Sequence, residues 1–189
     1  MSHDLSSMYE ITSQKPVVIW LTGLSAAGKT TIANELVQKF KALHVIPELL
    51  DGDVIRKITG ENGFDEASRI RHNLRVGQMA SNLEKEGKIV IVALISPYAE
   101  IRQQVRKMCD HFIEVHVATK LELCIQRDPK GLYRKALAGE IEHFTGISSP
   151  YKTPINPEIV IDTIDQSVEE CAGIIFDFYL KVISNPITT

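Results

Sequence analysis

The order of apolar and polar segments along the chain predicts strands that alternate with helices. Five short apolar segments have the length and β-branched composition of buried strands: residues 17–22, 45–50, 89–95, 111–117 and 158–162. Apolar side chains recur at helical spacing between them, at residues 30–43, 67–86, 99–109, 120–126 and 166–182. The pattern predicts an α/β fold in which a five-stranded parallel sheet is sandwiched by helices.

Two segments depart from this pattern. Residues 1–15 are polar and are predicted to form a flexible N-terminal arm, which leaves residues 16–189 as a single domain. Residues 127–157 are rich in glycine, proline, lysine and arginine and have no sustained period. Because a long segment without regular elements is usually functional, we predict a lid at residues 127–157.

Composition narrows the class of protein. The 189 residues are 44% hydrophobic and 24% charged with a net charge of -3, so no global field attracts nucleic acid or an anionic membrane. The N-terminus has no apolar signal region, and the apolar runs are too short to span a bilayer. Cys109, Cys124 and Cys171 lack metal-site spacing and are interpreted as reduced thiols. We therefore expect a soluble, cytoplasmic protein.

Residues 23–30 have the spacing G-x-x-x-x-G-K-T between a predicted strand and a predicted helix, which is typical of a P-loop. Gly23 and Gly28 allow successive N–H groups to turn toward phosphate oxygens. Lys29 is expected to reach the β and γ phosphates and Thr30 to coordinate Mg²⁺. The alternative is a chance match in an unrelated loop. The residues expected to bind ATP are Gly23, Leu24, Ser25, Ala26, Ala27, Gly28, Lys29, Thr30, Thr31 and, from the lid, Arg127.

Three further segments fall at the ends of predicted strands, where an α/β sheet binds its ligands. These segments are residues 51–53, residues 96–97 and the start of the lid. Residues 51–53 are predicted to form a turn, in which Asp53 either orients an acceptor hydroxyl and supports Mg²⁺ or serves as a helix cap. Arg127 and Lys130 are expected to close over phosphates.

Other charged and aromatic residues can be interpreted either as ligand-binding residues or as structural ones. Arg56, Arg69, Arg71 and Arg75 suit phosphate or sulfate through their planar guanidinium groups, or form a solvated cationic face. Phe64 and Phe144 stand where core packing is not expected, so they either stack on a nucleobase or pack within the lid.

Several ordered motifs resemble the adenylylsulfate (APS) kinases. The matching segments are residues 21–25, 28–33, 50–53 with Arg56, 63–64 with Arg69, 95–98, 128–133, and 144–147 with 150–151. The P-loop is shared by many families, whereas the lid pair DPKGLY and FTGI is much more specific. The resemblance implies a P-loop kinase fold, ATP and Mg²⁺ as cofactors, and commonly a homodimer. It implies phosphorylation of the 3′-hydroxyl of APS to give PAPS, a step of sulfate assimilation.

The resemblance also assigns site residues by position. Asp53, Lys29 and Lys130 would be catalytic, and Thr30 and Asp53 would support the metal. Phe64 and Phe144 would sandwich the APS adenine, while Arg56 and Arg69 would hold its phosphate and sulfate. The complete set expected to bind APS is Asp51, Asp53, Arg56, Phe64, Arg69, His72, Ile95, Ser96, Pro97, Lys130, Gly131, Leu132, Phe144 and Thr145.

The chain departs from the family pattern on the acceptor side. Val54 replaces a frequent asparagine, Arg71-His72 replaces a Glu-Asn pair, and Ala99 replaces an arginine. Within the P-loop, Ala26 replaces a glycine, which is tolerable only if φ is negative there. Two alternatives therefore stay open: a P-loop kinase with a different nucleotide-conjugate or sugar acceptor, and a non-catalytic nucleotide-binding module.

Overall fold

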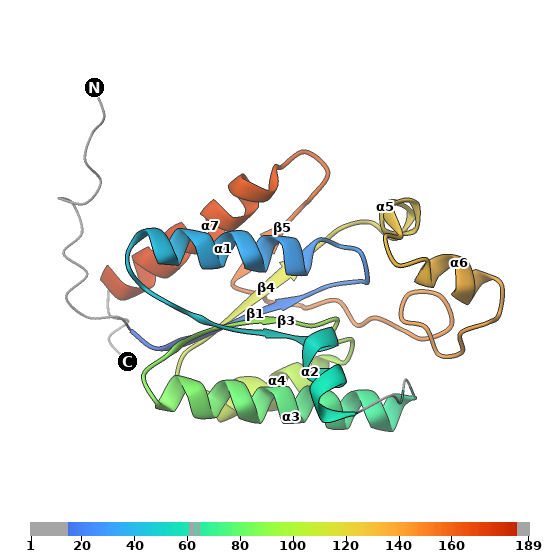
Figure 1. The fold of residues 1–189 in the computed structure, drawn as a ribbon, viewed down its shortest axis with the longest axis horizontal. Helices are drawn as coiled ribbons and strands as arrows, with labels where there is room; N and C mark the ends of the chain where they lie inside the picture. The colour runs from blue at the N-terminus through green and yellow to red at the C-terminus, as the bar shows by residue number, and fades with distance from the viewer. Residues whose placement is uncertain (1–14, 61–62, 64, 185–189) are drawn as a thin grey trace.

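The computed structural model describes residues 15–60, 63 and 65–184, and these residues surround a parallel sheet with the strand order β2-β3-β1-β4-β5 (Figure 1). The prediction of a five-stranded parallel sheet is confirmed. The strands are β1 (Val17–Thr22), β2 (Glu48–Asp51), β3 (Ile89–Ala93), β4 (Phe112–Val117) and β5 (Ile159–Ile161).

Helices cover both faces of the sheet (Figure 1). On one face, Ile19 and Leu21 of β1 join a core with helices α1 (Lys29–Ala42) and α7 (Val168–Ser184). On the other face, Val18 and Trp20 pack in a second core with α3 (Glu66–Lys85) and α4 (Ala99–Met108). Successive side chains of a strand point to opposite faces, so a strand buried on both faces is apolar at every position. This explains the unbroken apolar run of β1.

The turn predicted at residues 51–53 is instead the start of a helix, α2 (Gly52–Thr59). The carboxylate of Asp51 accepts hydrogen bonds from the amides of Asp53 (3.0 Å) and Val54 (3.3 Å). These bonds satisfy two of the amides that a helix leaves without partners in its first turn. Asp51 is therefore the N-cap, and the side chain of Asp53 stays available for other contacts.

The predicted lid is not devoid of regular structure. It follows α5 (Leu121–Arg127) and contains a further short helix, α6 (Leu132–Leu137). The carboxylate of Asp128 accepts hydrogen bonds from the amides of Tyr133 (3.1 Å) and Arg134 (3.0 Å), which anchors the first turn of α6. At six residues, α6 is too short for a periodic apolar pattern to reveal it.

Smaller differences affect strand and chain ends. β2 begins after Pro47, later than predicted, because proline cannot donate a ladder hydrogen bond. The predicted arm lies outside the described residues except for Lys15. Among the helices that the structure describes, none combines the length and apolarity needed to cross a bilayer.

Candidate active site

A cavity of about 1200 Å³ opens at the carboxyl ends of the strands and is lined by most of the predicted site residues. Its walls come from the P-loop, from the start of α2, from α3, from the loop after β3 and from the lid. Predicted residues on its lining include Lys29, Thr30, Asp51, Asp53, Arg56, Arg69, His72, Ile95, Ser96, Pro97, Arg127, Lys130, Leu132, Phe144 and Thr145.

The P-loop has the backbone shape that its glycines allow. Gly23 has φ +154, and a β-carbon there would meet the carbonyl oxygen of Val117 at 2.6 Å. Gly28 has φ +104 and is the N-cap of α1. Because the helix begins at this point, its free amides and its dipole face the cavity, an arrangement that favours phosphate.

Ala26 also adopts a left-handed conformation, with φ +57. The condition under which alanine was expected to be tolerable at this position, a negative φ, is therefore not met. A β-carbon in this region costs about 1 kcal/mol or more relative to glycine. The loop keeps the backbone shape suited to glycine even though the residue is alanine.

The ammonium group of Lys29 folds back onto the P-loop. Its Nζ donates hydrogen bonds to the carbonyl oxygens of Gly23 (2.9 Å) and Leu24 (2.6 Å). The side chain is 8% exposed, and burial lowers the pKa of Lys29 to about 8, against the opposing influence of Asp53 and Asp51. The lysine is thus held beside the phosphate cradle with its charge only partly compensated.

Thr30 contacts Asp51 rather than Asp53. Its Oγ1 donates a hydrogen bond of 2.7 Å to Asp51 Oδ2. A hydroxyl and a carboxylate from neighbouring elements are oxygen donors of the type that Mg²⁺ prefers, and Mg²⁺ keeps several waters besides. No cluster of three or more acidic, histidine or cysteine ligands occurs in the part of the chain that the structure describes.

Asp53 contacts the lid. Its carboxylate accepts a hydrogen bond from Lys130 Nζ, although the two residues are 77 positions apart. Both side chains are more than half exposed, so the ion pair itself adds little stability. Its consequence is positional: the DPKGLY segment lies against the carboxylate that follows β2.

The two arginines expected to bind the acceptor both reach backbone carbonyls. Arg56 Nη1 donates to the carbonyl oxygen of Gly63 (2.9 Å), and Arg69 Nη2 donates to that of His143 in the lid. Arg69 is buried, and its Nη1 has no hydrogen-bond partner among the described residues. A buried guanidinium nitrogen without a partner is costly, so this group is suited to an anionic ligand.

The two residues that replace the Glu-Asn pair of the family pattern, Arg71 and His72, point in different directions. His72 is buried and lines the cavity, whereas Arg71 is exposed and donates to Ser68 Oγ at 2.9 Å. Asn73 is buried beside His72 and donates to the carbonyl oxygen of Arg69 at 2.8 Å. The replacement of this pair therefore changes the cavity wall through His72 and not through Arg71.

Phe144 is buried in the lid and also lines the cavity. Its ring meets the edge of Tyr133 with centroids 5.0 Å apart, so lid packing accounts for one side of the ring. Phe64, its predicted partner around the adenine, lies outside the described residues. Gly131 caps α6 and does not line the cavity.

Two contacts that we did not predict tie distant segments to the P-loop. Tyr133 Oη donates to the carbonyl oxygen of Ser25 (3.1 Å), and Thr119 Oγ1 donates to that of Ala27 (2.9 Å). Arg127 Nη1 donates to the hydroxyl oxygen of Thr163 and Arg127 Nη2 donates to the carbonyl oxygen of Thr163, both at 3.0 Å. Thr119 and Thr163 follow the ends of β4 and β5, so the rule that sites form at strand ends could have indicated them.

The adenylylsulphate kinase family model matches residues 15–162 of this chain. The chain belongs to the adenylylsulphate kinase family. It is 48% identical over 163 residues to the adenylyl-sulfate kinase of Synechococcus sp. (strain JA-3-3Ab), covering 86% of this chain and 93% of that protein. The family resemblance seen in the motifs is confirmed.

Solved structures agree with this membership. The Mycobacterium tuberculosis APS kinase CysC in complex with AMPPNP and APS superposes with a TM-score of 0.83 at 39% identity, covering 88% of this chain and 98% of that one. A hexameric APS kinase from Thiobacillus denitrificans gives a TM-score of 0.65 at 31% identity, covering 89% of this chain and 29% of that one. The P-loop kinase fold expected for the chain is thus confirmed.

Proposed function

We propose that this chain is an APS kinase, which transfers the γ-phosphoryl group of ATP to the 3′-hydroxyl of APS to give PAPS and ADP. The observation that carries the proposal is the contact of Lys130 with Asp53. It places the DPKGLY segment, the most specific motif of the chain, over the cavity that also contains Lys29 and Thr30. The donor and acceptor motifs therefore share one cavity.

The ATP side uses the P-loop and the base of the lid. Lys29 exchanges its two loop carbonyls for phosphate oxygens when the triphosphate binds. Thr30 and Asp51 would hold Mg²⁺, which would neutralise charge on the transferring phosphates. Arg127 and Thr163 contact each other and line the same cavity, and we assign them to the ATP side.

The acceptor side supplies the proton acceptor. As the 3′-oxygen bonds to the γ-phosphorus, the bond between that phosphorus and the bridging oxygen of ADP breaks. Asp53 orients the hydroxyl and takes up its proton, and the Lys130 contact holds the carboxylate in place until the acceptor arrives. Lys29 and Lys130 stabilise the negative charge of the transferred group. Arg56 and Arg69 hold the phosphate and sulfate of APS, and Phe144 stacks on its adenine.

A coupled assay of ADP release tests this function. With ATP and Mg²⁺ present, addition of APS should start ADP release and produce PAPS in equal amount. Omission of APS is the control for ATP hydrolysis. ATP binding without any turnover of APS would overturn the proposal.

A different acceptor is the second candidate, and His72 is the observation that favours it. This side chain is buried in the acceptor wall at a position where the family has asparagine. A panel of nucleotide conjugates and sugars, each offered with ATP and Mg²⁺, distinguishes the two. Preference for APS by orders of magnitude would exclude this candidate. A non-catalytic nucleotide-binding role is the remaining alternative. The presence of Lys29, Thr30 and Asp53 around one cavity argues against it. Phosphoryl transfer to any acceptor in the panel would exclude it.

We further propose a homodimer located in the cytoplasm, where the reaction would serve sulfate assimilation. Ile58 of α2 is 75% exposed and lies outside the lining of the cavity, which supports a contact between copies of the chain. The cysteines at 109, 124 and 171 are free thiols, as in a reducing compartment. Light scattering after size exclusion measures the assembly, and a monomer at micromolar concentration would contradict the dimer.

A further inference from the structure

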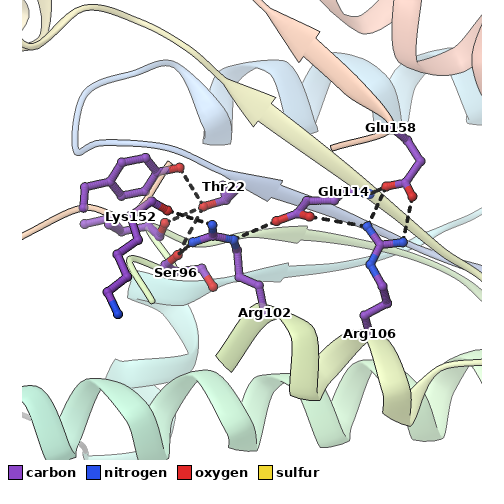
Figure 2. Close-up of polar contacts among 9 residues, drawn as sticks. Thr22, Ser96, Arg102, Arg106, Glu114, Lys152 and Glu158 are labelled. Atoms are coloured by element: carbon purple, nitrogen blue, oxygen red, sulfur yellow. Dashed lines mark hydrogen bonds and ion pairs between the residues drawn. The ribbon is translucent and has the colours of Figure 1, made fainter. Parts of the chain in front are cut away.

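Arg102 of α4 lies outside the cavity but contacts Ser96, which lines the cavity, and Lys152, at the end of the lid (Figure 2). Its side chain is 2% exposed. Nε donates to Glu114 Oε1, Nη1 to the carbonyl oxygen of Ser96 and Nη2 to the carbonyl oxygen of Lys152, each at 2.7 Å. One guanidinium thus joins the sheet, the loop after β3 and the end of the lid.

The loop held by Arg102 forms part of the acceptor wall. Ser96 is buried with φ +48, a left-handed conformation that is unfavourable for a residue with a β-carbon. Ser96 Oγ is buried without a hydrogen-bond partner among the described residues. The Ser96 carbonyl accepts from Arg102 (2.7 Å), and Thr22 Oγ1 donates to the carbonyl oxygen of the preceding residue, Ile95 (2.7 Å), so these two side chains maintain the loop in its unfavourable shape.

The same arginine fixes the end of the lid to this loop. The amide of Lys152 donates to the carbonyl oxygen of Pro97 (2.8 Å), and Tyr151 Oη lies 3.0 Å from Thr22 Oγ1. The Lys152 carbonyl accepts from Arg102. The chain that leaves the lid therefore runs along the acceptor loop and cannot shift without breaking these bonds.

Because Arg102 is buried, each of its donor groups needs its own hydrogen-bond acceptor. A charge removed from water is stable only when its donors are satisfied, so loss of either carbonyl would leave part of the guanidinium uncompensated. A buried ion pair is by itself weak grounds for a stabilising role, since apolar residues can pack as well. The specific feature of Arg102 is the simultaneous contact with Ser96 and Lys152.

We propose that Arg102 is a positioning residue for acceptor binding, which fixes the Ser96 loop and the end of the lid relative to each other. This inference rests on the proposed function because the acceptor measured is APS. Arg102 touches no substrate itself, so its removal should weaken APS binding and leave the ATP site nearly unchanged.

Arg106 provides a matched control. It lies one turn further along α4 and belongs to the same network, donating to Glu158 (2.7 and 2.8 Å) and to Glu114 (3.3 Å). Figure 2 shows Arg106 on the Glu158 side of Glu114, away from Ser96 and Lys152. Arg106→Lys and Arg102→Lys therefore remove guanidinium contacts from one network while keeping the charge.

Steady-state kinetics of the two variants test the proposal. Arg102→Lys should raise KM for APS about tenfold, as expected for two lost buried hydrogen bonds, and change KM for ATP and kcat by less than about threefold. Arg106→Lys should leave all three within about threefold, whatever its effect on Tm. Equal KM effects in the two variants, or a fall in Tm with unchanged KM for APS, would overturn the positioning role.

A second measurement does not depend on the acceptor. Hydrogen exchange of the Lys152 amide should accelerate at least about tenfold in Arg102→Lys and stay unchanged in Arg106→Lys. Unchanged exchange in Arg102→Lys overturns the inference. Failure of the unmodified protein to phosphorylate APS overturns the proposed function instead, so the two failures are distinguishable.

Discussion

Thr30 Oγ1 lies 2.7 Å from Asp51 Oδ2, so the P-loop helix is joined directly to the end of β2. The other oxygen of the same carboxylate caps α2. Asp51 therefore contacts the P-loop helix and caps α2, while Asp53 contacts Lys130 of the lid. Under the proposed function, the first carboxylate serves the metal side and the second serves the acceptor side.

This separation predicts a metal defect for Asp51→Asn. The amide oxygen can still accept hydrogen bonds at the cap, so Tm should change little, but the loss of negative charge weakens the Mg²⁺ site. We expect the Mg²⁺ concentration for half-maximal turnover to rise about tenfold or more. Titration of Mg²⁺ at saturating ATP and APS measures it, and an unchanged midpoint would remove Asp51 from the metal site.

Asp53→Ala is predicted to lose the chemical step. If Asp53 takes up the hydroxyl proton, turnover should fall about a hundredfold or more while ATP affinity changes little. Because Asp53 is 61% exposed at its side chain and does not supply the cap, Tm should stay close to that of the unmodified protein. Near-normal turnover would show that Asp53 contributes only its lid contact.

Local patterns account for what could be predicted from the sequence. Strands β1 and β3 are apolar at nearly every position, and the P-loop spacing is bounded by one strand and one helix, so these elements could be identified. The helix α2 was missed because only Ile55 among its apolar side chains is buried, and Val54 and Ile58 are exposed. Its pattern therefore does not reflect a buried face.

Contacts across the chain could not be predicted in this way. Lys130 and Asp53 are 77 positions apart, Arg69 and His143 are 74 apart, and Arg102 and Lys152 are 50 apart. Each pair depends on how the lid packs on the sheet, which no local spacing encodes. The rule that ligands bind at strand ends gave the place of the site, and the tertiary packing decided which side chains pair there.

Ala26→Gly is predicted to stabilise the protein. Relief of the left-handed strain outweighs the greater backbone freedom of glycine in the unfolded chain, so the free energy of unfolding should rise by roughly 0.5–1 kcal/mol. For a chain of this length, Tm should increase by about 1–4 °C. Ala27→Gly is the control, because Ala27 is fully buried and does not have a positive φ, so its loss should lower Tm. A fall in Tm for both variants would contradict strain at Ala26.

Binding of the triphosphate is predicted to be linked to proton uptake by Lys29. Burial lowers the pKa of this amine to about 8 in the empty protein, and anionic phosphates beside it favour the charged form, so they raise the pKa. A non-hydrolysable ATP analogue should therefore bind with uptake of a substantial fraction of a proton above about pH 8, and with almost none at about pH 6.5. Its affinity should accordingly decline as the pH rises above 8.

Calorimetry in buffers of different ionisation enthalpy measures this uptake. Lys29→Arg is the matched control, because a guanidinium stays protonated throughout this range and so has no proton to gain. In Lys29→Arg, binding of the ATP analogue should take up no proton, and the affinity for the analogue should not decline above pH 8. Equal uptake in the unmodified protein and in Lys29→Arg would assign the proton to another group and contradict the lowered pKa of Lys29.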